Sequence, residues 1–191
     1  MAGPELIRVA EPGDEQAIAE VVTVAFGESH GPVVARLVGA LRASPAWDPA
    51  LSFVACSVSG QVVGYVLATR NLLDAPRRLV DVLVLSPLAV HPDHQGCGIG
   101  ARLVRHALRV MASRPEPLVF LEGDPDYYPR FGFAPAGVRG FRRPSLRIPE
   151  PAFMVHPLPA YQPWMTGTLV YADPFWRRDC VGLRDPVEVN P

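Results

Sequence analysis

The sequence predicts a mixed α/β fold, in which one sheet that is antiparallel at its start is flanked by helices. Three observations predict it. Apolar residues over 11–26 recur at helical spacing, β-branched residues dominate both arms of 51–70, and a long amphipathic segment over 98–113 stands between two apolar runs.

The first half of the chain predicts a strand, two helices and a hairpin. Residues 5–9 form the strand, and a helix over 11–26 follows with Asp14 as its N-cap. The GESHG break then separates it from a second helix over 32–41, which Pro32 can open. Residues 51–70 predict two strands that turn at Ser59-Gly60.

The second half begins with an apolar run over 79–91, long enough for a strand buried on both faces. Pro87 lies inside it and predicts a bulge or a lost neighbour, because proline cannot donate a ladder hydrogen bond. The remaining predicted elements follow in chain order: a helix over 98–113, a strand over 117–121, a short helix over 124–131, and strands over 152–156 and 167–172. Parallel pairing is expected only around the long helix.

Composition narrows the function classes. The chain has 191 residues, a net charge of −1 and no basic block, which disfavours nucleic-acid binding. No apolar run reaches the roughly 20 residues of a membrane span, and no signal peptide is visible, so we expect a cytoplasmic protein. All 18 basic residues are arginine, which excludes a Walker-A lysine and a Schiff-base lysine. The three cysteines have no metal-ligand spacing, so no metal is expected.

The loop HQGCGIG at residues 94–100 precedes the best predicted helix. Glycine amides at a helix N-terminus can bind an anion such as phosphate. Three interpretations stand: a Rossmann GxGxxA motif that ends at Ala101, a plain strand–helix connection, or a Gln-x-x-Gly-x-Gly motif that starts at Gln95. Cys97 is either a small residue in a tight turn or a nucleophile with His94 as its base.

The third interpretation is supported by a resemblance to a known protein family. LAVHPDHQGCGIGARLVRHAL resembles the acetyl-CoA-binding motif of the GNAT N-acetyltransferases, and GDPDYYPRFGFAPA resembles the family segment with a tyrosine four residues before Gly-Phe. FMVHPL and GTLVYADPF look like the "predicted N-acetyltransferase" branch. The resemblance implies the GNAT fold, with splayed central strands, over a single domain at 1–175 and a tail at 176–191.

The resemblance also implies the chemistry, which is direct acetyl transfer from acetyl-CoA to a primary amine of a small molecule or peptide. The backbone groups of one set of residues would bind the cofactor: Leu88, Ala89, Val90, Gln95, Gly96, Cys97, Gly98, Ile99, Gly100 and Ala101. Arg102 or Arg105 could reach the 3′-phosphate. Tyr128 would protonate the leaving thiolate, with Tyr127 as the competing residue. A homodimer is a family-level expectation.

The resemblance does not identify the residue that acts as the general base. Several family members carry a glutamate where this chain has Val84, and the frequent pantetheine-binding asparagine is Leu121 here. Four residues are candidate bases: Glu122, Asp81, Glu28 and His30. The missing glutamate keeps a second hypothesis in view, an acyl-CoA-binding sensor or scaffold without efficient turnover. A dinucleotide-binding oxidoreductase is the third.

Overall fold

The computed structural model describes residues 6–181, which form two compact units. Unit 1 contains residues 6–69 and 85–114, and unit 2 contains residues 70–84 and 115–181. Strands β3 (Val62–Asp74) and β4 (Leu79–Val90) each contribute residues to both units. Of the predicted tail at 176–191, residues 182–191 lie outside the described part of the chain.

Unit 1 is built on an antiparallel meander. Strand β1 (Leu6–Val9) pairs with β2 (Ser52–Cys56), with Ile7 opposite Ala55, and β2 pairs with β3, with Phe53 opposite Val66. The predicted hairpin is confirmed. Its turn glycine, Gly60, has a φ of 84°, a backbone conformation that side-chain-bearing residues rarely adopt.

Helix α1 (Glu15–Arg42) contains the two predicted helices, but the break between them is shorter than predicted. The break between its two helical halves is confined to Gly27, which has φ 75° and ψ 176°, and Pro32 lies inside the second half instead of opening it. A Cβ atom at Gly31 would lie 2.0 Å from the Thr23 carbonyl oxygen. Glycine at position 31 therefore permits the close approach of the two halves, which the sequence pattern did not reveal.

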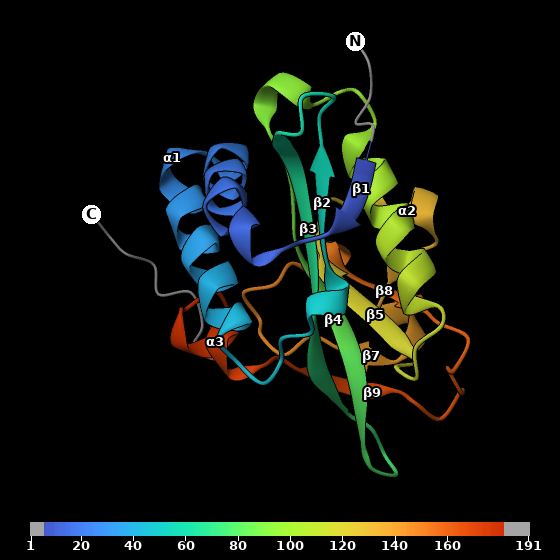
Figure 1. The fold of residues 1–191 in the computed structure, drawn as a ribbon. Helices are drawn as coiled ribbons and strands as arrows, with labels where there is room; N and C mark the ends of the chain where they lie inside the picture. The colour runs from blue at the N-terminus through green and yellow to red at the C-terminus, as the bar shows by residue number, and fades with distance from the viewer. Residues whose placement is uncertain (1–5, 182–191) are drawn as a thin grey trace. The chain divides into compact units, whose positions relative to one another are not determined.

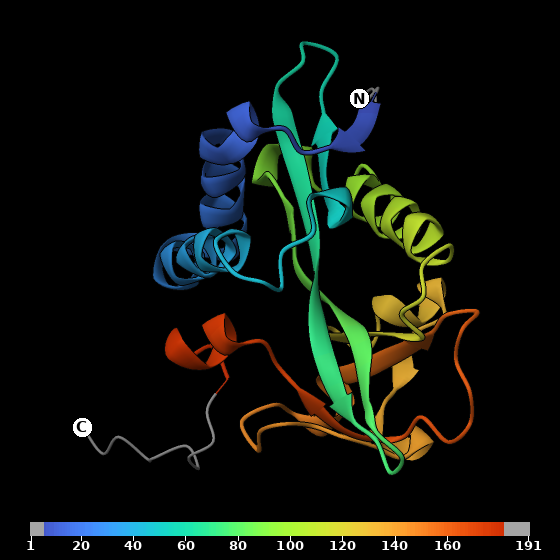
Figure 2. The ribbon, with the colours of Figure 1, turned by 60° about the horizontal axis from the view of Figure 1, so that its bottom comes forward.

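Helix α2 (Ile99–Met111) packs on the strands of unit 1 as the amphipathic pattern predicts. Its residues Ile99 and Leu103 lie directly over Gly64 of β3, where a Cβ would meet both side chains at 3.0 Å. His106 makes an edge-on contact with Phe53 of β2, with ring centroids 4.8 Å apart. Figures 1 and 2 show α1 and α2 on opposite sides of the unit 1 strands.

Unit 2 combines parallel and antiparallel pairing. Strand β5 (Leu118–Glu122) runs parallel to β4, with Val84 opposite Phe120, and antiparallel to β8 (Phe153–Pro157). The other strands of this unit are β6 (Ala134–Pro135), which pairs with β8, and β9 (Gly167–Val170), which pairs with the end of β3. The core of the unit includes Phe120, whose ring stacks on that of Phe153 at 5.6 Å.

Two expectations for unit 2 need correction, and one helix was not predicted. Strand β7 (Phe141–Arg142) runs parallel to β9, so parallel pairing is not confined to the surroundings of α2. The predicted helix over 124–131 is reduced at its start to a 3-10 turn at Tyr128–Phe131, and Gly132 ends this turn in a left-handed conformation. A short helix α3 (Asp173–Arg177) follows β9.

Short 3-10 turns connect many of these elements: Pro12–Asp14, Pro49–Leu51, Pro92–His94, Gly137–Arg139 and Glu150–Ala152. Each contains or adjoins a proline or glycine, residues that favour turns. Within residues 6–181, no helix has both the length and the apolar character needed to cross a membrane.

Candidate active site

The glycine loop in unit 1 is shaped as an anion site. Gly96 and Gly98 both have left-handed backbones, with φ of 72° and 77°, and α2 begins directly afterwards at Ile99. The backbone amides of residues 96–101 donate to no other group among the described residues, whereas the Arg102 amide already bonds the Gly98 carbonyl at 3.0 Å. Unpaired amides in alternating conformations at a helix N-terminus are the typical surroundings of a bound phosphate.

Gln95 closes this loop onto strand β4. Its side-chain Nε2 donates to the Val90 carbonyl at 3.0 Å, where the strand ends. Leu88 and Val90 are partly exposed and Ala89 is buried, and the strand passes through Pro87 with a cis Ser86–Pro87 peptide bond. All ten predicted cofactor-binding residues lie in unit 1, which contains residues 85–114.

The positive φ angles explain the two glycines of the loop. A Cβ atom at Gly96 or Gly98 would meet nothing within 4 Å, so space does not require glycine there. Cys97 between them is half-buried and Arg102 is exposed.

Tyr128 in unit 2 occupies a defined position at the start of its 3-10 turn. Its ring lies against the Cα of Gly123, where an added Cβ would come within 2.2 Å of the Tyr128 Cε2 atom. Phe133 contacts the same ring edge-on at 5.8 Å, and Tyr127 does so at 5.1 Å. Burial, with smaller contributions from Tyr127 and Asp124, raises the pKa of Tyr128, so its phenol stays protonated at neutral pH.

Glu122 ends strand β5, one residue before Gly123. The Tyr171 hydroxyl donates to its Oε1 at 2.5 Å. Desolvation raises the pKa of the Glu122 carboxyl, and the bond from Tyr171 lowers it in part. Glu122 keeps exposed surface, so its carboxylate can meet a partner from solvent.

No sequence pattern indicated a role for Tyr171, which is 4% exposed. It lies 49 residues from Glu122 along the chain, so no local spacing could link the two. Its ring packs against Phe175 at 4.6 Å, and the Trp176 indole donates to its backbone carbonyl at 2.9 Å. The buried Asn71 holds the next residue, since its Oδ1 accepts from the Ala172 amide at 2.8 Å.

The other candidate bases, like Glu122, keep exposed surface. Asp81, Glu28 and His30 are all exposed, and His30 contacts the Ser29 hydroxyl at 2.9 Å. Val84, the position where several family members carry glutamate, is 1% exposed. Among residues 6–181, no three His, Cys, Asp or Glu side chains are grouped as a metal site.

Comparisons with known proteins identify the family of the chain. The model of the acetyltransferase (GNAT) family matches residues 18–133. The chain belongs to the GNAT family of acetyltransferases. It is 36% identical over 170 residues to the uncharacterized N-acetyltransferase YjhQ of Escherichia coli K12, covering 87% of this chain and 91% of YjhQ.

Solved GNAT structures are similar over nearly the whole chain. The E. coli acetyltransferase YhbS, crystallised with CoA, is 31% identical with a TM-score of 0.79, and the match covers 92% of this chain and 93% of YhbS. A Brucella melitensis acetyltransferase, crystallised with acetyl-CoA, is 29% identical with a TM-score of 0.70, over 89% and 97% of the two chains. The mixed α/β fold predicted from the sequence is thereby confirmed. The dinucleotide-binding interpretation fails, because the strands that precede the loop form an antiparallel meander.

Proposed function

We propose that this GNAT protein transfers the acetyl group of acetyl-CoA directly to a primary amine of a small molecule or peptide. The observation that carries the proposal is the row of unpaired amides over residues 96–101 at the start of α2. Their number and the helix dipole suit the pyrophosphate of CoA. The CoA and acetyl-CoA complexes of the similar structures support the same ligand.

The cofactor-binding residues divide into two groups. The loop from Gln95 to Ala101 would hold the pyrophosphate, and the backbone of Leu88 to Val90 would hold the pantetheine arm. Gln95 fixes the loop to the strand end through its bond to the Val90 carbonyl. When bound, acetyl-CoA supplies an acetyl group activated as a thioester.

Tyr128 is the proposed acid that protonates the leaving thiolate. Its ring is held by Gly123 and Phe133, and its raised pKa keeps the proton available. Tyr127 is the weaker candidate, because its ring is occupied by the Arg130 guanidinium at 4.8 Å.

Glu122 is the proposed base for the acceptor amine. Burial raises the pKa of its carboxyl, and the hydroxyl of the buried Tyr171 orients that carboxylate. A base with a pKa nearer neutrality accepts a proton more readily than an ordinary carboxylate does. The transfer needs no covalent enzyme intermediate, so the residues act by positioning and proton movement.

The buried Val84 keeps a second function in consideration, an acyl-CoA-binding sensor or scaffold without efficient turnover. Both functions predict CoA binding, and only the enzyme predicts acetyl transfer. A homodimer and a cytoplasmic location remain predictions, which light scattering and cell fractionation can test.

The deciding experiment combines binding with turnover. Acetyl-CoA should bind by calorimetry while NAD gives no heat, and a panel of amines should release free CoA in the presence of the enzyme. Tyr128→Phe should lower the transfer rate by about 10²-fold or more without changing acetyl-CoA affinity. Tyr127→Phe is the matched control and should keep most of the rate.

Tight binding with no transfer to any amine would favour the sensor. Absence of acetyl-CoA binding would refute both functions.

A further inference from the structure

A pocket lies wholly within unit 1, between the two halves of α1. Its volume is about 450 Å³, within the range of small-molecule pockets. Nine residues line it: Glu15, Ile18, Ala19, Ala35, Val38, Gly39, Arg42, Ala43 and Trp47. None of them belongs to the residues proposed for acetyl-CoA binding or transfer.

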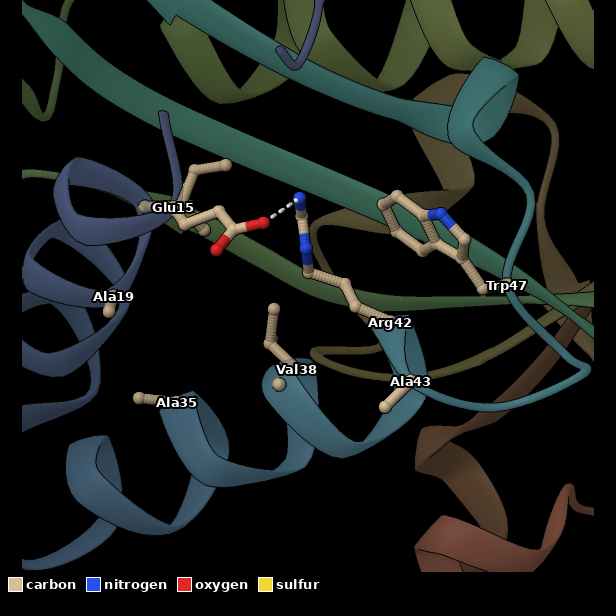
Figure 3. A pocket seen from close by; sticks show the side chains of 9 residues that line it. Glu15, Ala19, Ala35, Val38, Arg42, Ala43 and Trp47 are labelled. Carbon is tan, nitrogen blue, oxygen red and sulfur yellow. Dashed lines mark hydrogen bonds and ion pairs between the residues drawn. The ribbon is translucent and has the colours of Figure 1, made fainter. Parts of the chain in front are cut away.

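The cavity exists because small residues line both halves of the helix. Ala19 projects from the first half and Ala35 from the second (Figure 3). Gly39, also in the second half, adds no side chain. Larger side chains at these positions would fill the space, while Ile18 and Val38 supply apolar wall. An apolar ligand group can therefore be accommodated between the two helical halves.

A single ion pair supplies the charge in the lining. The Arg42 Nη2 atom donates to Glu15 Oε1 at 2.9 Å, and the Arg42 guanidinium stacks over the Trp47 ring at 4.7 Å (Figure 3). The Arg42 side chain is 18% exposed, whereas that of Glu15 is 64% exposed. The guanidinium is thus held rigidly, and the carboxylate is accessible from solvent.

The guanidinium still has hydrogen-bonding capacity to spare. Its Nη1 atom is buried and has no hydrogen-bond partner among the described residues. An unsatisfied buried donor is unfavourable, so an anionic group that draws the guanidinium toward the cavity would be stabilised. Two other titratable groups lie near Arg42: Asp14, whose carboxylate is engaged by Arg8 through two bonds, and the buried Tyr65, whose hydroxyl is hydrogen-bonded with that of Ser52.

We propose that this cavity binds a free α-amino acid with an apolar side chain. Its carboxylate would bond Arg42, its ammonium group would bond the exposed Glu15 carboxylate, and its side chain would lie against Ile18 and Val38. The lining carries one positive and one negative charge side by side, so a zwitterionic head complements both. A ligand with only one of the two charges leaves the opposite group of the pair unmatched.

The test uses the full-length chain without acetyl-CoA, so that no transfer can occur. L-phenylalanine is the probe for calorimetric or NMR titration, and phenylacetate and phenethylamine are its single-charge analogues. L-phenylalanine should bind, and each analogue should bind at least tenfold more weakly. Added CoA should leave the L-phenylalanine affinity unchanged.

Two variants locate the binding. Ala35→Leu fills the cavity with a good helix former and should abolish binding, while a thermal melt confirms that it folds. Glu15→Gln removes the negative charge and should weaken binding at least tenfold, whereas Glu20→Gln, an exposed glutamate on the same helical half, should not. The proposal is overturned by no L-phenylalanine binding at millimolar concentration, by equal binding of phenylacetate, by competition with CoA, or by wild-type affinity in both variants.

Discussion

Gly98 offers a direct test of the loop geometry, because its left-handed backbone favours glycine whereas its surroundings leave room for a side chain. Its φ is 77°, a left-handed conformation that costs a residue with a Cβ about 1–2 kcal/mol. A Cβ at this position would meet nothing within 4 Å, so Gly98→Ala adds backbone strain and no steric overlap. The expected cost is therefore about 1–2 kcal/mol in total.

That cost can be observed in two ways. If the loop of the variant keeps its left-handed conformation, the free energy of unfolding falls. If the loop relaxes to another conformation, acetyl-CoA affinity falls, because binding must restore the left-handed conformation. The sum of the two losses should be about 1–2 kcal/mol, which is roughly fivefold to thirtyfold when expressed wholly as affinity. Urea denaturation and calorimetric titration measure the two parts.

Matched variants separate strain from other causes. Gly98→Asn should cost less than Gly98→Ala, because asparagine tolerates the left-handed region. Gly13→Ala should change neither quantity appreciably, since Gly13 also has no atom within 4 Å of an added Cβ and its φ is not positive. A combined loss near zero for Gly98→Ala, or equal losses for alanine and asparagine, would refute the reasoning.

Three further substitutions test other parts of the structure. Tyr171→Phe removes the donor that lowers the pKa of Glu122, so that pKa should rise and the acid limb of the kcat/KM profile should move to higher pH. At the acidic end the rate should fall about tenfold, the equivalent of roughly 1.5 kcal/mol, whereas an unmoved limb would exclude this role. Gly123→Ala should displace the Tyr128 ring and lower transfer at unchanged acetyl-CoA affinity, and a full transfer rate would contradict that placement. Leu103→Ala, at a fully buried position of α2, should lower the free energy of unfolding by about 3 kcal/mol in urea, where an unchanged midpoint would contradict the packing.

Elements with a strong local pattern were predictable from the sequence. Helix α2 has its buried residues at helical spacing, and the hairpin has β-branched arms around Gly60, so neighbouring residues alone specify both. Segments without such a pattern were not. Strands β6 and β7 have two residues each, and their pairing with β8 and β9 depends on residues far along the chain.

The sequence by itself determined the mixed α/β class and the family, and it predicted the cofactor loop, because the pattern of a glycine-rich helix start lies in consecutive residues. Only the tertiary structure decided that Tyr171 contacts Glu122 and that α1 folds back to pair Glu15 with Arg42. Those contacts join residues 49 and 27 positions apart, and their formation depends on strand pairing and on the Gly27 break rather than on local spacing. Local periodicity specifies which face of an element is buried, whereas the partner that covers it is set by packing of the whole unit.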